Sequence, residues 1–151
     1  VGSEVVLRGP QGVFTLPETI DKELFFICTG TGIAPFRSMV EYIYRNNVPH
    51  KNLYLIFGCR YRHDFLYFDE LNELQQKLSS FHYLTTCSRE TGEDQSLRKG
   101  YVHNIYEEIL TNSKPEANFY LCGWKNMVDE AKQRIIALGY DKKDIHLELY
   151  G

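Results

Sequence analysis

Short apolar runs alternate with longer amphipathic stretches along most of the chain. The apolar runs have strand length and little polar alternation, which is typical of parallel strands buried on both faces of a sheet. We expect strands at residues 24–29, 52–58, 82–87, 118–122 and 145–150. Apolar positions recur at helical spacing in residues 35–45, 67–78, 103–110 and 125–138. This alternation predicts an α/β fold, a five-stranded parallel sheet with helices on both faces.

The first 20 residues do not share this pattern. Residues 5–7 are predicted to form a short strand, residues 9–12 a turn and residues 15–23 a connector. We interpret residues 1–20 as the tail of a preceding domain plus a linker, and residues 21–151 as one domain. Because the chain begins with valine, we expect the natural N-terminus to lie upstream.

Composition narrows the possible functions. The net charge is -3 and there is no Lys/Arg run, which argues against nucleic-acid binding. No apolar stretch approaches the roughly 18 residues of a membrane-spanning helix. The four cysteines are not in Cys-x-x-Cys pairs and the five histidines lack metal spacing, so we expect no metal site. Buried, reduced thiols are expected, which fits a cytoplasmic protein. The histidines are expected to have surface or packing roles.

The strongest local signal covers residues 29–38 and reads Thr-Gly-Thr-Gly-Ile-Ala-Pro-Phe-Arg-Ser. It follows the first strand and opens a helix. Its glycines allow a ligand to approach the backbone closely, and Pro35 suits a first helical turn. The helix N-terminus favours an anion such as a pyrophosphate. The alternative is a Gly-x-Gly turn that only connects a strand to a helix.

This string differs from the common dinucleotide-binding fingerprint. Pro35 replaces the third glycine of Gly-x-Gly-x-x-Gly. The second strand ends in Gly58-Cys59-Arg60 and lacks the acidic residue that reads a ribose diol. An arginine at this position attracts phosphate, so we expect the nucleotide to be held differently.

Six separated segments resemble the ferredoxin–NADP reductase superfamily, including its diflavin reductase and oxygenase-reductase branches. In family order, they are residues 9–14, residues 30–38, residues 56–60 with 64–67 and 70–71, residues 88–90 with 99–102, residues 120–123 with Met127, and residues 148–150. The resemblance covers nearly the whole chain. With it, we expect the sheet order 3-2-1-4-5 and a nucleotide across the carboxyl ends of the strands.

The resemblance implies a role for each segment. The pyrophosphate would be held by Thr29, Gly30, Thr31, Gly32, Ile33, Ala34 and Pro35, with Arg60 nearby. The 2′-phosphate of NADP would be held by Ser88, Arg89 and Lys99, while Tyr101 would stack on the adenine. The nicotinamide would lie against Cys122, Gly123 and Met127. The catalytic residues would be Cys122, Glu148 and Tyr150.

Each assignment has an alternative. Arg60 could form a surface ion pair with Asp64 or Asp69. Ser88, Arg89 and Lys99 could belong to a solvated loop. Cys122 could be a core thiol and Tyr150 a packing residue of the last strand. Gly151 departs from family members that end on the aromatic residue itself.

The function implied by the resemblance is hydride transfer from NADPH to FAD, followed by electron transfer to a ferredoxin, flavodoxin or haem protein. The family's flavin domain carries an Arg-x-Tyr-Ser/Thr string that this sequence lacks. We therefore expect the flavin domain to be missing, and the chain alone to bind NADP(H), or else NAD(H), but to be catalytically incomplete. Two alternatives remain: an NADH-dependent reductase component of an oxygenase, and a non-catalytic module that senses nucleotide or docks a partner.

Overall fold

Parallel strands form a single sheet in the order β4-β3-β2-β1-β5-β6 in this computed structural model. The structure describes residues 2–6, 9, 12–91 and 97–149. The strands are β1 (Glu23–Thr29), β2 (Leu53–Cys59), β3 (Phe81–Cys87), β4 (Arg98–Lys99), β5 (Ala117–Gly123) and β6 (Ile145–Leu149). The fold class and the relative order of the five predicted strands are confirmed.

The predicted strand number was wrong, because the sheet has six strands. The additional strand is β4, which pairs with the end of β3 through Thr86↔Arg98 and Cys87↔Lys99. Both of its residues are exposed and charged. A strand of two such residues carries no apolar pattern and could not be recognised by periodicity.

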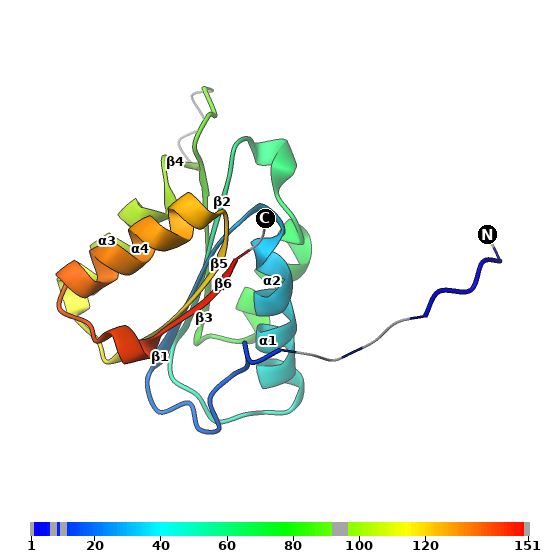
Figure 1. Ribbon diagram of the computed structural model, residues 1–151, viewed down its shortest axis with the longest axis horizontal. Helices are drawn as coiled ribbons and strands as arrows, with labels where there is room; N and C mark the ends of the chain where they lie inside the picture. The colour runs from blue at the N-terminus through cyan, green and yellow to red at the C-terminus, as the bar shows by residue number, and fades with distance from the viewer. Residues whose placement is uncertain (1, 7–8, 10–11, 92–96, 150–151) are drawn as a thin grey trace.

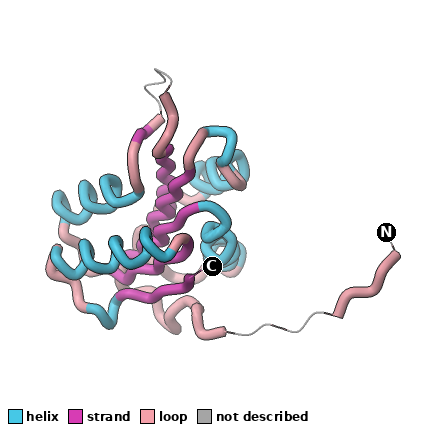
Figure 2. The backbone as a smooth tube through the Cα atoms, turned by 45° about the horizontal axis from the view of Figure 1, so that its top comes forward, coloured by secondary structure: helices cyan, strands magenta, loops and turns pink. Residues whose placement is uncertain are grey.

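Two helices cover each face of the sheet (Figures 1 and 2). One layer contains α1 (Ile33–Arg45) and α2 (Phe68–Lys77), and the other contains α3 (Val102–Ser113) and α4 (Lys125–Ala137). Short 3-10 turns are η1 (Gly30–Gly32), η2 (Arg62–Asp64) and η3 (Lys142–Asp144). The helices join consecutive parallel strands, which leaves the carboxyl ends of the strands at one edge of the layers.

The central strand β1 contributes to two hydrophobic cores. Leu24, Phe26 and Cys28 pack in the core on the α1–α2 side. Phe25 and Ile27 pack in the core on the α3–α4 side. All five side chains are fully buried. Burial on both faces explains why this segment is continuously apolar rather than alternating.

The N-terminal segment differs from its prediction in one respect. Val5 and Val6 are exposed and belong to no strand, because an extended segment needs a neighbouring strand to form a ladder. The later part packs on the domain: the ring of Phe14 lies 5.8 Å from that of Phe36 and 5.5 Å from that of Tyr120. Within the described residues, no helix is both long and apolar enough to cross a membrane.

Candidate functional site

A cavity of about 550 Å³ opens at the carboxyl ends of β1, β2 and β3. The starts of α3 and α4 complete its wall. Six residues predicted to bind the cofactor line it: Thr29, Gly30, Arg60, Ser88, Tyr101 and Met127. Its volume lies in the range of small-molecule sites, which is roughly 300–1,000 Å³.

At the end of β1 the chain turns directly into a helix. Gly30 adopts a positive φ of 55°, and no atom lies within 4 Å of where its Cβ would be. The helix α1 begins at Ile33, so Pro35 falls in its first turn, as predicted. Thr29 and Gly30 thus bring open backbone to the cavity beside a helix N-terminus, an arrangement that suits an anionic group.

Beneath this turn, Gly32, Cys122 and Gly123 form a close backbone contact that we call the glycine junction. A Cβ on Gly32 would lie 2.7 Å from the carbonyl carbon of Cys122 and 3.0 Å from the nitrogen of Gly123. Gly123 has a φ of 140°, and its Cβ would lie 2.5 Å from Thr29 Oγ1. The same hydroxyl accepts a 3.4 Å bond from the Trp124 N–H. The junction therefore fixes α1 against the end of β5.

The ends of β2 and β3 form a second feature, which we call the polar rim: Arg60, Ser88 and Arg89. The Ser88 N–H donates to the Cys59 carbonyl at 3.0 Å, and the Arg89 N–H donates to the Arg60 carbonyl at 2.9 Å. These bonds continue the ladder beyond both strands. They hold a hydroxyl and two guanidinium groups on adjacent segments, with all three residues exposed.

The ion pair considered for Arg60 is not found among the described residues. Asp64 instead accepts a 3.0 Å bond from the Tyr61 N–H and lies 3.5 Å from His63 Nε2. Arg60 lines the cavity directly after β2. Its guanidinium is thus placed to meet an anion there.

The remaining predicted residues are more dispersed. Lys99 lies in β4 at the sheet edge, outside the cavity lining. Cys122 is fully buried and is the register partner of Glu148 on β6. Two predicted catalytic residues are therefore neighbours, although neither lines the cavity. Tyr150 and Gly151 lie outside the described residues.

The string of residues 29–35 divides between positions that line the cavity and positions that do not. Ile33 is fully buried in the core. The residues of the string that do not line the cavity are Thr31, Gly32, Ile33, Ala34 and Pro35. A bidentate ion pair between Arg37 and Glu70, at 2.7 and 3.0 Å, connects α1 to α2. Both residues belong to the segments that resemble the reductase family.

The thiols are free. Cys28 and Cys87 are buried as expected, and Cys122, which was predicted to lie beside the nicotinamide, is buried as well. Cys59 is only partly buried, because it ends β2 at the cavity. Its Sγ lies 3.6 Å from that of Cys87 on the neighbouring strand. Burial is the main cause that raises the pKa of both thiols above the usual value. Among the described residues, no group of three or more His, Cys, Asp and Glu side chains could hold a metal ion.

Nine further cavity residues were not among the predicted site residues: Gly58, Cys59, Asp64, Gly100, Val102, His103, Trp124, Asn126 and Glu130. The prediction gave His103 a surface or packing role, and it is buried in the wall of the cavity. Glu130 lies on α4, and its side chain is 49% exposed. No spacing rule links these two residues, because their proximity depends on how α3 packs beside α4.

Comparison with known proteins places the chain. The model of the oxidoreductase NAD-binding domain matches residues 26–133. The chain belongs to this family. This family assignment confirms the resemblance that was drawn from the motifs. It also makes a nicotinamide nucleotide the expected ligand of the cavity. The cavity fits that ligand through its size, its open backbone at Gly30 and its cation at Arg60.

Two relatives of this NAD-binding domain cover nearly the whole chain. Ferredoxin–NADP reductase B of Sorangium cellulosum is 32% identical over 99% of this chain and 63% of its own length. The toluate 1,2-dioxygenase electron transfer component of Pseudomonas putida is 33% identical over 99% of this chain and 43% of its own. The chain thus spans about two fifths to just under two thirds of these relatives.

A solved structure supports the fold of the NAD-binding domain. The cytochrome P450 reductase of Amycolatopsis superposes with a TM-score of 0.82 at 24% identity. The match covers 93% of this chain and 42% of that one. This likeness concerns the fold alone.

Proposed function

We propose that this chain is the nucleotide-binding half of a flavin-dependent reductase that uses NADPH as its hydride donor. The observation that carries the proposal is the polar rim. It places Arg60, Ser88 and Arg89 at the carboxyl ends of β2 and β3, beside a cavity of about 550 Å³. The Ser88 hydroxyl and the Arg89 guanidinium suit the additional phosphate of NADP, with Lys99 as a further charge and Arg60 near the pyrophosphate, because charge-assisted bonds are the strong ones.

Other residues of the chain have distinct roles in this proposal. Thr29 and Gly30 bind the pyrophosphate at the start of α1, while Tyr101 and Met127 contact the adenosine and nicotinamide parts. When bound, the nucleotide supplies a hydride that the flavin of the complete protein accepts. The chain aligns the donor at near contact and excludes water. Cys122, Glu148 and Tyr150 remain the proposed catalytic residues.

The complete protein extends the proposal. We propose that residues 1–20 are the tail and linker of a flavin-binding barrel, which makes the isolated chain catalytically incomplete. The acceptor of the complete protein is a ferredoxin, flavodoxin or haem protein. Four free cysteines support a cytoplasmic location.

Calorimetric titration of the chain with NADP⁺ and NAD⁺ tests the nucleotide assignment. We expect at least a tenfold preference for NADP⁺, since one additional charge-assisted bond of about 1.4 kcal/mol gives that factor. Arg89→Ala is expected to abolish most of the preference. Arg45→Ala is the matched control, because Arg45 lies in the last turn of α1 and is exposed. A wild-type chain that binds both nucleotides equally would contradict the use of NADPH.

A second candidate is an NADH-dependent reductase component of an oxygenase. Its support is that the chain is 33% identical to the toluate dioxygenase component and 32% identical to the ferredoxin reductase, so the two relatives are about equally similar to it. A preference for NAD⁺ in the same titration would favour it. In that case Arg89→Ala would leave the affinity for NAD⁺ unchanged.

A further inference from the structure

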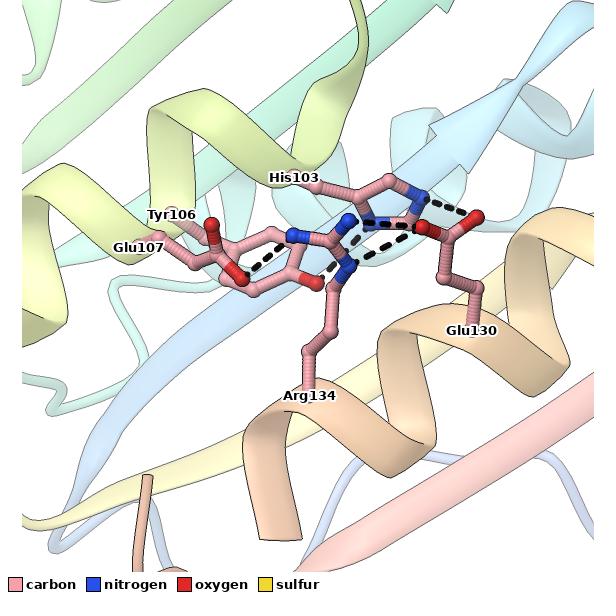
Figure 3. Close-up of polar contacts among 5 residues, drawn as sticks. All are labelled: His103, Tyr106, Glu107, Glu130 and Arg134. Atoms are coloured by element: carbon pink, nitrogen blue, oxygen red, sulfur yellow. Dashed lines mark hydrogen bonds and ion pairs between the residues drawn. The ribbon is translucent and has the colours of Figure 1, made fainter. Parts of the chain in front are cut away.

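A network of five side chains joins α3 to α4 beside the cavity (Figure 3). His103, Tyr106 and Glu107 project from α3, while Glu130 and Arg134 project from α4. Arg134 donates to Glu107 Oε1 at 2.9 Å and to Glu130 Oε1 at 2.8 and 3.0 Å. Both helices begin at the cavity, so the network fixes that part of its wall.

The tautomer of His103 follows from its two neighbours. Its Nδ1 lies 2.9 Å from the Tyr106 hydroxyl, and its Nε2 lies 3.4 Å from Glu130 Oε2. The opposite tautomer would set an Nε2 lone pair against the carboxylate. The hydroxyl therefore donates to Nδ1, and the ring proton sits on Nε2, facing Glu130.

Glu130 keeps acceptor capacity on one oxygen. Oε1 accepts both bonds from Arg134, whereas among the described residues Oε2 meets only the long contact with His103. Arg134 is the main cause that lowers the pKa of Glu130, so the carboxylate is ionised at neutral pH. The side chain is 49% exposed and lines the cavity. An anchored carboxylate oxygen is thus available to a donor on a ligand.

The surroundings of Glu130 suit a flat ring rather than a phosphate. Tyr101 and Trp124 line the same cavity and are 68% and 71% exposed. Aromatic faces stack well on heteroaromatic rings. A carboxylate repels a phosphate and accepts a hydrogen bond from an amino group.

We propose that Glu130 recognises the exocyclic amino group of the adenine ring of the bound dinucleotide, and so makes the site selective for adenine over hypoxanthine. This inference rests on the proposed function. Hypoxanthine has the same shape, but a carbonyl oxygen replaces the amino group and would face the carboxylate. His103 and Arg134 are positioning residues that hold Glu130 toward the ring.

Titration of the full 151-residue chain with NADP⁺ and with nicotinamide hypoxanthine dinucleotide phosphate tests the proposal. The two probes differ only at the purine, so the ratio of their affinities isolates this contact. We expect wild type to prefer the adenine form about tenfold, as a hydrogen bond to a charged group allows. In Glu130→Gln the ratio should fall to about one, because an amide can pair with either ring.

Asp129→Asn is the matched control, since this neighbour pairs with Lys125 on the same helix and does not line the cavity. It should keep the tenfold ratio. His103→Gln should reduce the ratio to about threefold without abolishing binding, a change that a purely structural role would not produce. A thermal melt confirms that each variant is folded.

The outcomes separate this inference from the proposed function. Equal binding of both dinucleotides to wild type, or a tenfold ratio that persists in Glu130→Gln, would overturn the role of Glu130 alone. Failure of wild type to bind either dinucleotide would overturn the nucleotide assignment and this inference together.

Discussion

The glycine junction and the polar rim lie at the same edge of the sheet but are built in opposite ways. At the junction, Gly32 and Gly123 let two backbones meet so closely that a single Cβ overlaps backbone or hydroxyl atoms. At the rim, Ser88 and Arg89 expose side chains from segments held by backbone hydrogen bonds. The junction thus sets the shape of the site, whereas the rim sets its charge and specificity.

Adding one methyl group should break the junction and have the largest effect. Gly32→Ala places its Cβ against the backbone of Cys122 and Gly123, so we expect a loss of about 3 kcal/mol in unfolding free energy. Denaturant unfolding measures it. Gly30→Ala is the control, because its Cβ meets no atom within 4 Å and only the positive φ opposes it, at about 1 kcal/mol. Equal losses in both variants would refute the close-contact explanation.

A change of salt concentration should weaken phosphate binding at the polar rim and leave the packing at the glycine junction unchanged. The Debye length falls from about 30 Å at 0.01 M to about 8 Å at 0.15 M salt, which screens exposed charges. We expect the preference of the chain for NADP⁺ over NAD⁺ to fall about threefold across this range. Titration at both ionic strengths measures it. In Arg89→Ala, the residual preference should change less with salt than it does in wild type.

A change of pH should affect the cavity wall at the buried His103. Burial is the main cause that lowers the pKa of His103, against the opposing effect of Glu130. The unfolded chain, with an ordinary histidine pKa of about 6.5, then binds a proton more readily than the folded one. Stability should therefore fall as the pH drops below about 6.5, and less steeply in His103→Gln.

His146 sets the background for this measurement, because burial also lowers its pKa. Some loss of stability in acid should thus persist in His103→Gln. Denaturant unfolding between pH 7.5 and about 5.5 measures both contributions. If the two proteins lost stability in parallel, the assignment of the effect to His103 would be wrong.

Alkylation of the cysteines should give the smallest effect and map the two regions. At the base of the rim, Cys59 is partly exposed, so we expect it to react first, although more slowly than free cysteine because burial raises its pKa. Cys28 and Cys122, register partners on β1 and β5 at the junction, are fully buried and should react only on unfolding. Mass spectrometry after timed iodoacetamide treatment would show the order, and early labelling of Cys122 would contradict it.

The sequence predicted the features that depend on local pattern. The apolar runs located the long strands, and residues 29–38 located the turn at the head of α1 because glycine and proline act through their own backbone. The polar strand β4 was not predicted, since Arg98 and Lys99 are charged residues that cannot be distinguished by pattern from those of a loop. The pairing of His103 with Glu130 was not predicted either. The two residues lie on different helices, and their network depends on long-range contacts such as that of Glu107 with Arg134, which lie 27 positions apart in the sequence.

The pairing of β1 with β5 has a consequence for how the chain folds. Leu24 is the register partner of Asn118 and Cys28 that of Cys122, so the middle of the sheet closes only after most of the domain has been synthesised. Until then, the apolar side chains of Phe25 and Ile27 in β1 lack the neighbouring strand β5. Contacts of such long sequence separation slow folding, and during this time the exposed hydrophobic surface is prone to aggregation. Since α1 meets β5 at Gly32, competence to bind the nucleotide should be among the last properties that the nascent chain acquires.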